Sequence, residues 1–168
     1  MRRWVWIGGL GLVGVLAVLA GGRPAGAEHF DITLRLRTSK GVAESSWDTS
    51  PPEGGLNARQ SVTASAGEEL YLEWSFRSEF PHGVMKAVRA RLFVAPEGEI
   101  GQRKLPPAGT PTVLDNDLVA SFRPKHLARG HLYFRAPEPG NYLVRLESEE
   151  TIKEHGHEHF AALDLKVE

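Results

Sequence analysis

The sequence predicts an all-β domain, an antiparallel β-sandwich of about eight strands that follows an N-terminal signal peptide. Three observations predict this fold class. After residue 27, polar and apolar residues alternate with a period of two, no segment shows a helical repeat, and Gly/Pro-rich turns separate the alternating segments. Half-buried strands joined by such turns are typical of sandwiches, and a closed barrel is the alternative.

The first four strands come from the clearest alternation. Residues 29–37 carry apolar side chains at every second position, and residues 60–66 show the same pattern more weakly. In residues 70–77 the apolar series includes Trp74, which makes this the clearest core strand. Residues 88–95 repeat the pattern with arginines at the polar positions.

The last four strands follow a Pro/Gly-rich connection. Residues 112–122 form a longer and less regular strand. Residues 131–136 and 141–147 are expected to form a hairpin around the turn Pro-Glu-Pro-Gly at 137–140. Residues 159–167 close the chain. Eight short strands of this kind favour an Ig-like or transthyretin-like sandwich.

The N-terminal segment has the three-part layout of a secretory signal peptide. A basic Met-Arg-Arg start precedes an uncharged apolar run at 4–21, and small residues occupy 25–27. Cleavage is expected after Ala27, which leaves a single β-sandwich domain at 28–168. We therefore expect a periplasmic or secreted protein without stable membrane insertion; an uncleaved N-terminal anchor is the alternative.

Composition excludes several classes of function. Removing three arginines of the signal peptide from 20 basic residues leaves 17 against 21 acidic residues, a net charge of −4. Such a surface argues against nucleic-acid binding, which calls for a basic stripe. The chain has no cysteine, so thiol catalysis and thiolate metal sites are excluded, and a bacterial periplasm or exterior is favoured.

Histidines form the strongest chemical signal. The run His155-Gly156-His157-Glu158-His159 places three imidazoles at alternate positions. On an extended chain they would lie on one side, roughly 7 Å apart. Two such imidazoles can share one Zn²⁺ or Cu²⁺. The predicted metal ligands are His157, His159, His82 and His155.

Strand order suggests where these histidines meet. If eight strands alternate strictly in direction, one end of the sandwich collects the loop of Trp47, His82, His126, the strand start at His131, and the run 155–159. This count puts His29 at the opposite end. A count that is wrong by one strand brings His29 to the cluster instead.

A second metal hypothesis concerns the new N-terminus. Cleavage after Ala27 would expose Glu28-His29, whose amine, amide and imidazole suit Cu²⁺. Cleavage one residue later would make His29 terminal, as in copper monooxygenases. The signal-peptide pattern favours Ala27.

Outward arginines allow two interpretations. Seven fall on predicted outer strand positions: Arg35, Arg37, Arg77, Arg89, Arg91, Arg135 and Arg145. They would bind acidic glycans or a carboxylate-rich partner, or they would pair across strands with acids. We favour cross-strand pairing.

Trp47 lies in a Ser/Pro/Gly-rich segment, where an exposed indole suits contact with carbohydrate or protein. The alternative is that it folds back over the end of the sandwich. It is the predicted ligand-binding residue of the metal-free hypothesis.

Four stretches carry a resemblance: Pro51–Asn57, Pro81–Val84, Glu138–Arg145 and His157–Phe160. Together they resemble an uncharacterised family of exported proteins of planctomycete-like bacteria, for which no activity is implied. The Pro-Gly-x-Tyr-x-Val ending of the hairpin is similar to Ig-like and transthyretin-like domains, which implies a sandwich.

These observations predict an exported, non-catalytic binding module that binds zinc or copper through the histidine cluster. No catalytic motif of a serine hydrolase or a zinc protease is present in the sequence. The alternative is a metal-free domain that recognises a cell-envelope polymer or protein. A second alternative is a metalloenzyme with an open His-ligated site.

Overall fold

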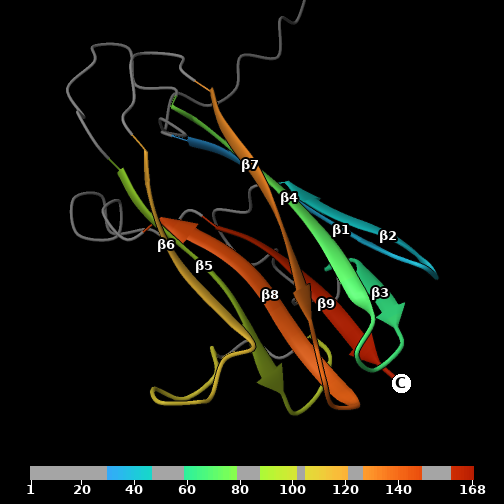
Figure 1. The fold of residues 1–168 in the computed structure, drawn as a ribbon. Coiled ribbons are helices and arrows are strands. Elements are labelled where there is room, and N and C mark those ends of the chain that lie inside the picture. The colour runs from blue at the N-terminus through green and yellow to red at the C-terminus, as the bar shows by residue number, and fades with distance from the viewer. Residues whose placement is uncertain (1–29, 47–58, 79–87, 102–104, 121–126, 149–159) are drawn as a thin grey trace, which may run out of the picture.

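Two β-sheets face each other in the computed structural model of the chain, and apolar side chains fill the space between them (Figure 1). The structure describes residues 30–46, 59–78, 88–101, 105–120, 127–148 and 160–168. These residues form nine strands and no helix, which confirms the predicted all-β sandwich over the barrel alternative. No helix within the described ranges is long and apolar enough to cross a membrane.

The first sheet has the strand order β2-β1-β4-β7, and all of its pairings are antiparallel. Its strands are β1 (Phe30–Thr38), β2 (Gly41–Ser46), β4 (Glu69–Ser78) and β7 (Leu127–Arg135). We call it sheet A. The central pair is held in register by Leu34 opposite Trp74 and Arg35 opposite Glu73.

The second sheet has the order β3-β9-β8-β5-β6, and we call it sheet B. Its strands are β3 (Ser61–Ala64), β5 (Val88–Glu97), β6 (Leu114–Ala120), β8 (Gly140–Ser148) and β9 (Phe160–Val167). Four of these strands pair antiparallel, but β3 runs parallel to β9. The expectation of a wholly antiparallel sandwich is therefore wrong at this edge.

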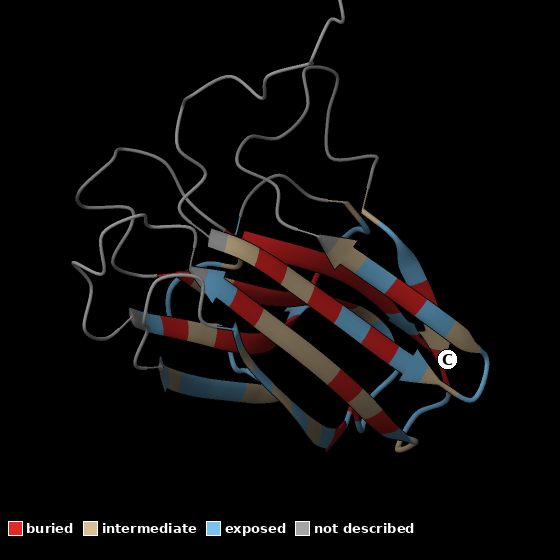
Figure 2. Ribbon diagram, turned by 90° about the horizontal axis from the view of Figure 1, so that it is seen from above, coloured by how far each residue is buried: buried red, intermediate tan, exposed pale blue. Residues whose placement is uncertain are grey.

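Buried and less buried residues alternate along several of the strands (Figure 2), and the buried apolar side chains form the core between the sheets. The largest fully buried members are Ile32, Leu34, Leu36, Leu70, Leu72, Leu92, Leu146, Leu163 and Leu165. Burial of a side chain of this size contributes about 1.5–3 kcal/mol, so this alternation dictates which face of each strand turns inward.

A smaller buried cluster lies on the outer side of sheet B. It consists of Phe93, Ala95, Leu143, Phe160 and Ala162. Strands β8 and β9 are therefore buried on both faces, which explains the continuous apolar run at the start of β9.

Arg145 belongs to this covered face. The sequence predicts an outward strand position for it, and only 6% of the residue is exposed there. Its Nε donates to Glu147 Oε2 over 2.6 Å, and its guanidinium lies 3.9 Å from the centre of the Phe160 ring. The outward position is confirmed, and Arg145 is nevertheless buried because this part of the outer face of β8 is covered.

The eight predicted strands all overlap observed ones, with two differences in sheet A. Strand β2 occupies part of a segment that was expected to be a loop. Strand β7 begins at Leu127, before the predicted start at His131. The first difference changes the expected place of His29, and the second changes that of His131.

Candidate functional site

The strand directions give the sandwich two distinct ends. At one end β1, β5, β7 and β9 begin and β2, β4, β6 and β8 finish, and we call it the loop end. Paired residues define it: Phe30 lies opposite Ser78 on sheet A, and Val88 lies opposite Ala120 on sheet B. Strand β8 ends in the same place, because Ser148 pairs with Ala90.

Six of the seven histidines occur in sequence segments that adjoin strands at this loop end. They are His29, His82, His126, His155, His157 and His159, and Trp47 also follows a strand that finishes there. All seven of these residues lie outside the described part of the chain. The additional strand β2 changes the strand count by one, so His29 precedes a strand that begins at the loop end.

His131 is the seventh histidine, and its expected place beside the others is wrong. It lies within β7 on sheet A, opposite Glu73 of β4, and its side chain is exposed. The error follows from the boundary of β7, which begins four residues before the predicted start.

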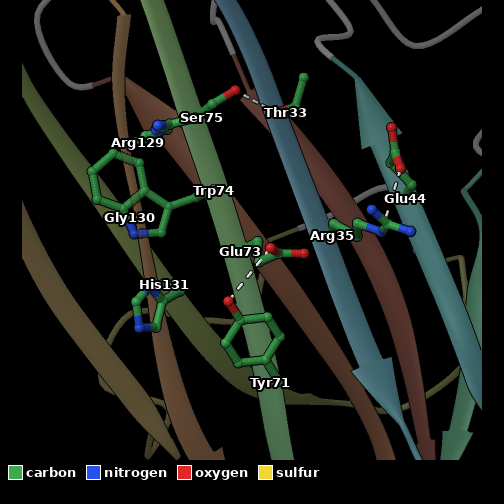
Figure 3. A pocket seen from close by; sticks show the side chains of 10 residues that line it. All are labelled: Thr33, Arg35, Glu44, Tyr71, Glu73, Trp74, Ser75, Arg129, Gly130 and His131. Carbon is green, nitrogen blue, oxygen red and sulfur yellow. Dashed lines mark hydrogen bonds and ion pairs between the residues drawn. The ribbon is translucent and has the colours of Figure 1, made fainter.

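A shallow depression with a volume of about 500 Å³ lies on sheet A. Its lining includes Thr33, Arg35, Tyr71, Glu73, Arg129 and His131, drawn in Figure 3. Because side chains alternate across a strand, all six belong to the face of sheet A that points away from the core. We call this surface the outer face of sheet A.

Small side chains make this depression. Thr33 and Ser75 lie opposite each other on β1 and β4, and their hydroxyl groups form a hydrogen bond. Arg129 of β7, which has a longer side chain, lies opposite Ser75. Tyr71 precedes Ser75 by four residues on β4 and also lines the depression. The floor is therefore polar and low, and long side chains surround it (Figure 3).

Three rings form a cluster along one side of the depression. The ring centroids of Tyr71 and Tyr133 are 5.0 Å apart, and that of His131 is 5.5 Å from Tyr71. The three planes are inclined to each other, the arrangement that aromatic pairs prefer. Tyr133 is 60% exposed, so its ring is open to a ligand.

Most charges of the outer face are paired across strands. Arg37 Nη2 lies 3.1 Å from Glu73 Oε2, and Arg35 Nε lies 3.7 Å from Glu44 Oε2. Arg135 and Glu69 form a third pair across β4 and β7 at 2.9 Å. The preference for cross-strand pairing is confirmed for these arginines. Of the arginines described on this face, Arg77 and Arg129 form no ion pair.

A buried ionic cluster lies on sheet B. Arg59 Nη2 is 2.8 Å from Glu97 Oε1 and 3.0 Å from Asp164 Oδ1, and the three side chains are 9%, 2% and 2% exposed. Burial raises the pKa of both carboxyl groups, against the lowering effect of the Arg59 guanidinium. We call this group the Arg59 cluster. Two carboxyl groups facing one cation favour the retention of a proton.

Within the described residues, no three His, Asp or Glu side chains are placed to hold a metal ion. The four predicted ligands lie outside those residues, so the prediction of a zinc or copper site stays a prediction.

The sequence matches no protein-family model and no curated protein. Among solved structures, the chain is similar to the soluble domain of PmoD from Methylocystis sp. ATCC 49242 (Rockwell). The two share 11% identity with a TM-score of 0.39, over 75% of this chain and 92% of that chain. A likeness of this size does not define a family.

Sequence reasoning missed the outer face of sheet A as a site. Tyr71 and Tyr133 are far apart in the sequence, and only the β4–β7 register makes them neighbours. A signal was present: Leu127, Arg129 and His131 alternate with the small residues Ala128 and Gly130, a period of two that runs into the predicted strand. That pattern would have extended the strand and placed Arg129, His131 and Tyr133 on one face.

Proposed function

We propose that the protein is an exported, non-catalytic binding module that holds Zn²⁺ or Cu²⁺ with His157 and His159, and that His82 and His155 complete the ligand set. The start of β5, the end of β8 and the start of β9 are neighbours at the loop end. His82 precedes the first of these in sequence, and the other three histidines precede the last. The observation that carries the proposal is that these three strand ends lie next to one another.

Ligand chemistry favours these two metals. A chain without cysteine offers imidazole nitrogen and carboxylate oxygen, and imidazole suits Zn²⁺ and Cu²⁺. The N-terminal basic and apolar layout supports export, where a metal is acquired outside the cytoplasm. Because three protein ligands leave an open position in catalytic zinc sites, a set of four histidines favours a closed, non-catalytic site.

Calorimetric titration of the metal-free chain from Glu28 onward tests the proposal, since this chain contains all nine described strands. We expect one site of micromolar or tighter affinity for Zn²⁺ or Cu²⁺. The double substitution His157→Ala/His159→Ala should weaken binding by about 100-fold or more, because two imidazole ligands are lost.

His131→Ala is the matched control, because it removes a histidine that the structure describes on the outer face of sheet A and that is not among the proposed ligands. It should leave the affinity within about twofold. Binding that survives in the double variant, or that His131→Ala abolishes, would refute the ligand assignment. Far-ultraviolet circular dichroism of each variant checks that the strands are retained.

A metal-free module that recognises a cell-envelope polymer or protein is the second candidate function. The outer face of sheet A favours it, because the exposed rings of His131 and Tyr133 and the charged groups that line the depression face outward. Trp47, the contact that the sequence suggests, lies outside the described residues.

A further inference from the structure

We propose that the outer face of sheet A binds an acidic polysaccharide, a sugar chain that carries carboxylate groups. The site consists of Tyr71, Tyr133 and His131 as ring contacts and of Arg129 and Arg77 as the groups that recognise the carboxylates. This inference rests on the second candidate function and is independent of the metal site.

The ring cluster supplies the sugar contact. Tyr133 is 60% exposed, and its ring lies beside those of Tyr71 and His131. A tyrosine ring offers a flat apolar surface at low cost in conformational entropy, together with a polar hydroxyl group. Pyranose rings have apolar C–H faces and polar edges, so they fit a surface of this kind.

Unpaired guanidinium groups supply the preference for acid. Arg77 and Arg129 are diagonal neighbours across β4 and β7, because Arg77 pairs with Leu127 and Ser75 pairs with Arg129. Both are exposed, and Arg129 lines the depression. Diagonal side chains on one face are about 7–8 Å apart, within reach of one extended ligand. An arginine without a carboxylate partner favours a bidentate anion.

The described acidic groups of the same face leave Arg129 without a compensating charge. Glu73 is held by Arg37, and Glu44 by Arg35. Asp31 is opposite Arg77 in the β1–β4 register, but these two described side chains form no ion pair. A ligand carboxylate at Arg129 therefore meets an uncompensated positive charge.

The position on a sheet face favours a sugar over an acidic peptide. Peptides are commonly held by addition to a sheet edge or by an apolar groove. Here the rings lie on the outward faces of β4 and β7, and the floor of the depression carries hydroxyl groups from Thr33 and Ser75. Hydroxyl-rich ligands match this polar floor.

The test compares three polymers by affinity electrophoresis and calorimetry with the chain from Glu28 onward. Polygalacturonate is the acidic sugar, fully methyl-esterified polygalacturonate has the same backbone without charge, and polyglutamate is the acidic peptide. A chelator in all samples removes divalent ions that would bridge carboxylates. It also keeps the metal site of the proposed function empty.

We expect binding to polygalacturonate that weakens as salt rises, with at least about tenfold weaker binding to the ester and to polyglutamate. Arg129→Gln and Tyr133→Ala should each weaken binding by about tenfold. Arg89→Gln is the matched control, because Arg89 is exposed on β5 of the other sheet. It removes the same charge and should leave binding within about twofold.

Two kinds of result would overturn the inference, and they are distinguishable. Equal binding to the ester or to polyglutamate, still sensitive to Tyr133→Ala, would refute the acidic sugar while keeping the outer face as a binding surface. Absence of binding to all three polymers, or binding that Arg129→Gln and Tyr133→Ala leave unchanged, would refute both the ligand and this site.

Discussion

The indole of Trp74 lies against the backbone of Gly130, its partner in the β4–β7 register. A Cβ atom added at Gly130 would come within 2.6 Å of the indole Cζ2 atom. The half-buried ring packs against the core between the sheets. This close approach fixes how β7 sits beside β4, and therefore where Arg129 and His131 lie in the depression.

Gly130→Ala should lower the free energy of unfolding by about 1–3 kcal/mol, because the methyl group forces the indole or strand β7 to move. Chemical unfolding followed by tryptophan fluorescence measures the change. Gly41→Ala is the control, since its added Cβ would lie at an ordinary distance of 3.7 Å from Val62. An equal or smaller loss in Gly130→Ala than in Gly41→Ala would contradict the packing argument.

Arg59→Ala should be among the most damaging single substitutions outside the apolar core. Glu97 and Asp164 would stay buried without their cation, and breaking a buried ion pair costs about 3–5 kcal/mol. Lys40→Ala removes an exposed pair with Glu168 and should cost less than about 1 kcal/mol. Urea unfolding curves of the two variants compare these losses directly; similar losses would show that the Arg59 cluster does not stabilise the fold.

The Arg59 cluster also predicts the sign of a pH effect. Burial raises the pKa of Glu97 and of Asp164 in the folded chain, so the folded state holds more protons than the unfolded state. The stabilisation that comes from holding these protons is complete below the unfolded pKa values, about 4.3 for Glu97 and about 3.9 for Asp164. It is lost as the pH rises through the folded values.

Glu97→Gln removes the group that gives up this proton. The stability of the variant relative to the natural chain should therefore increase from about pH 4.5 upward. Asp164→Asn should act in the same direction, because the two carboxyl groups titrate as a pair. Unfolding free energies measured across this pH range check the trend, and a difference that stays constant with pH would rule out the shared proton.

Tyr142→Phe should cost about 0.5–1.5 kcal/mol of stability, the usual contribution of one intramolecular hydrogen bond. The buried Tyr142 hydroxyl donates to the carbonyl of Glu138 over 2.7 Å and so ties the turn to β8. Tyr133→Phe removes a hydroxyl from a ring that is 60% exposed and should change stability by less than about 0.5 kcal/mol. Thermal unfolding with both variants in parallel measures the difference, which disappears if the Glu138 bond contributes nothing.

The central strands could be predicted from the sequence because their burial alternates. In β4, Leu70, Leu72 and Phe76 are all buried, as the period-two pattern requires. Strand β2 has no such signal: Ala43 is buried, while Val42 is 51% exposed. It forms at the edge of sheet A through its backbone pairing with β1, which a pattern of apolar residues does not register.

The start of β7 was missed in the sequence for a related reason. Its inward positions hold Ala128 and Gly130, which are small because the Trp74 indole occupies the space that larger side chains would fill. Where a side chain of a neighbouring strand fills the core, the strand itself carries small residues, and its sequence resembles that of a loop. The outer-face site depends on this strand, so the same effect hid Arg129.

The parallel pairing of β3 with β9 has a consequence for the biogenesis of the molecule. β9 lies between β3 and β8, and among the described strands it is the only neighbour of β3 within sheet B. As the chain grows from its N-terminus, residues 61–64 must wait for residues 164–167 before this edge can close. Pairings so distant in sequence are slow to form. Among the described strands, this edge of sheet B is therefore expected to close late in folding, only after β9 has been made and has found its place beside β8.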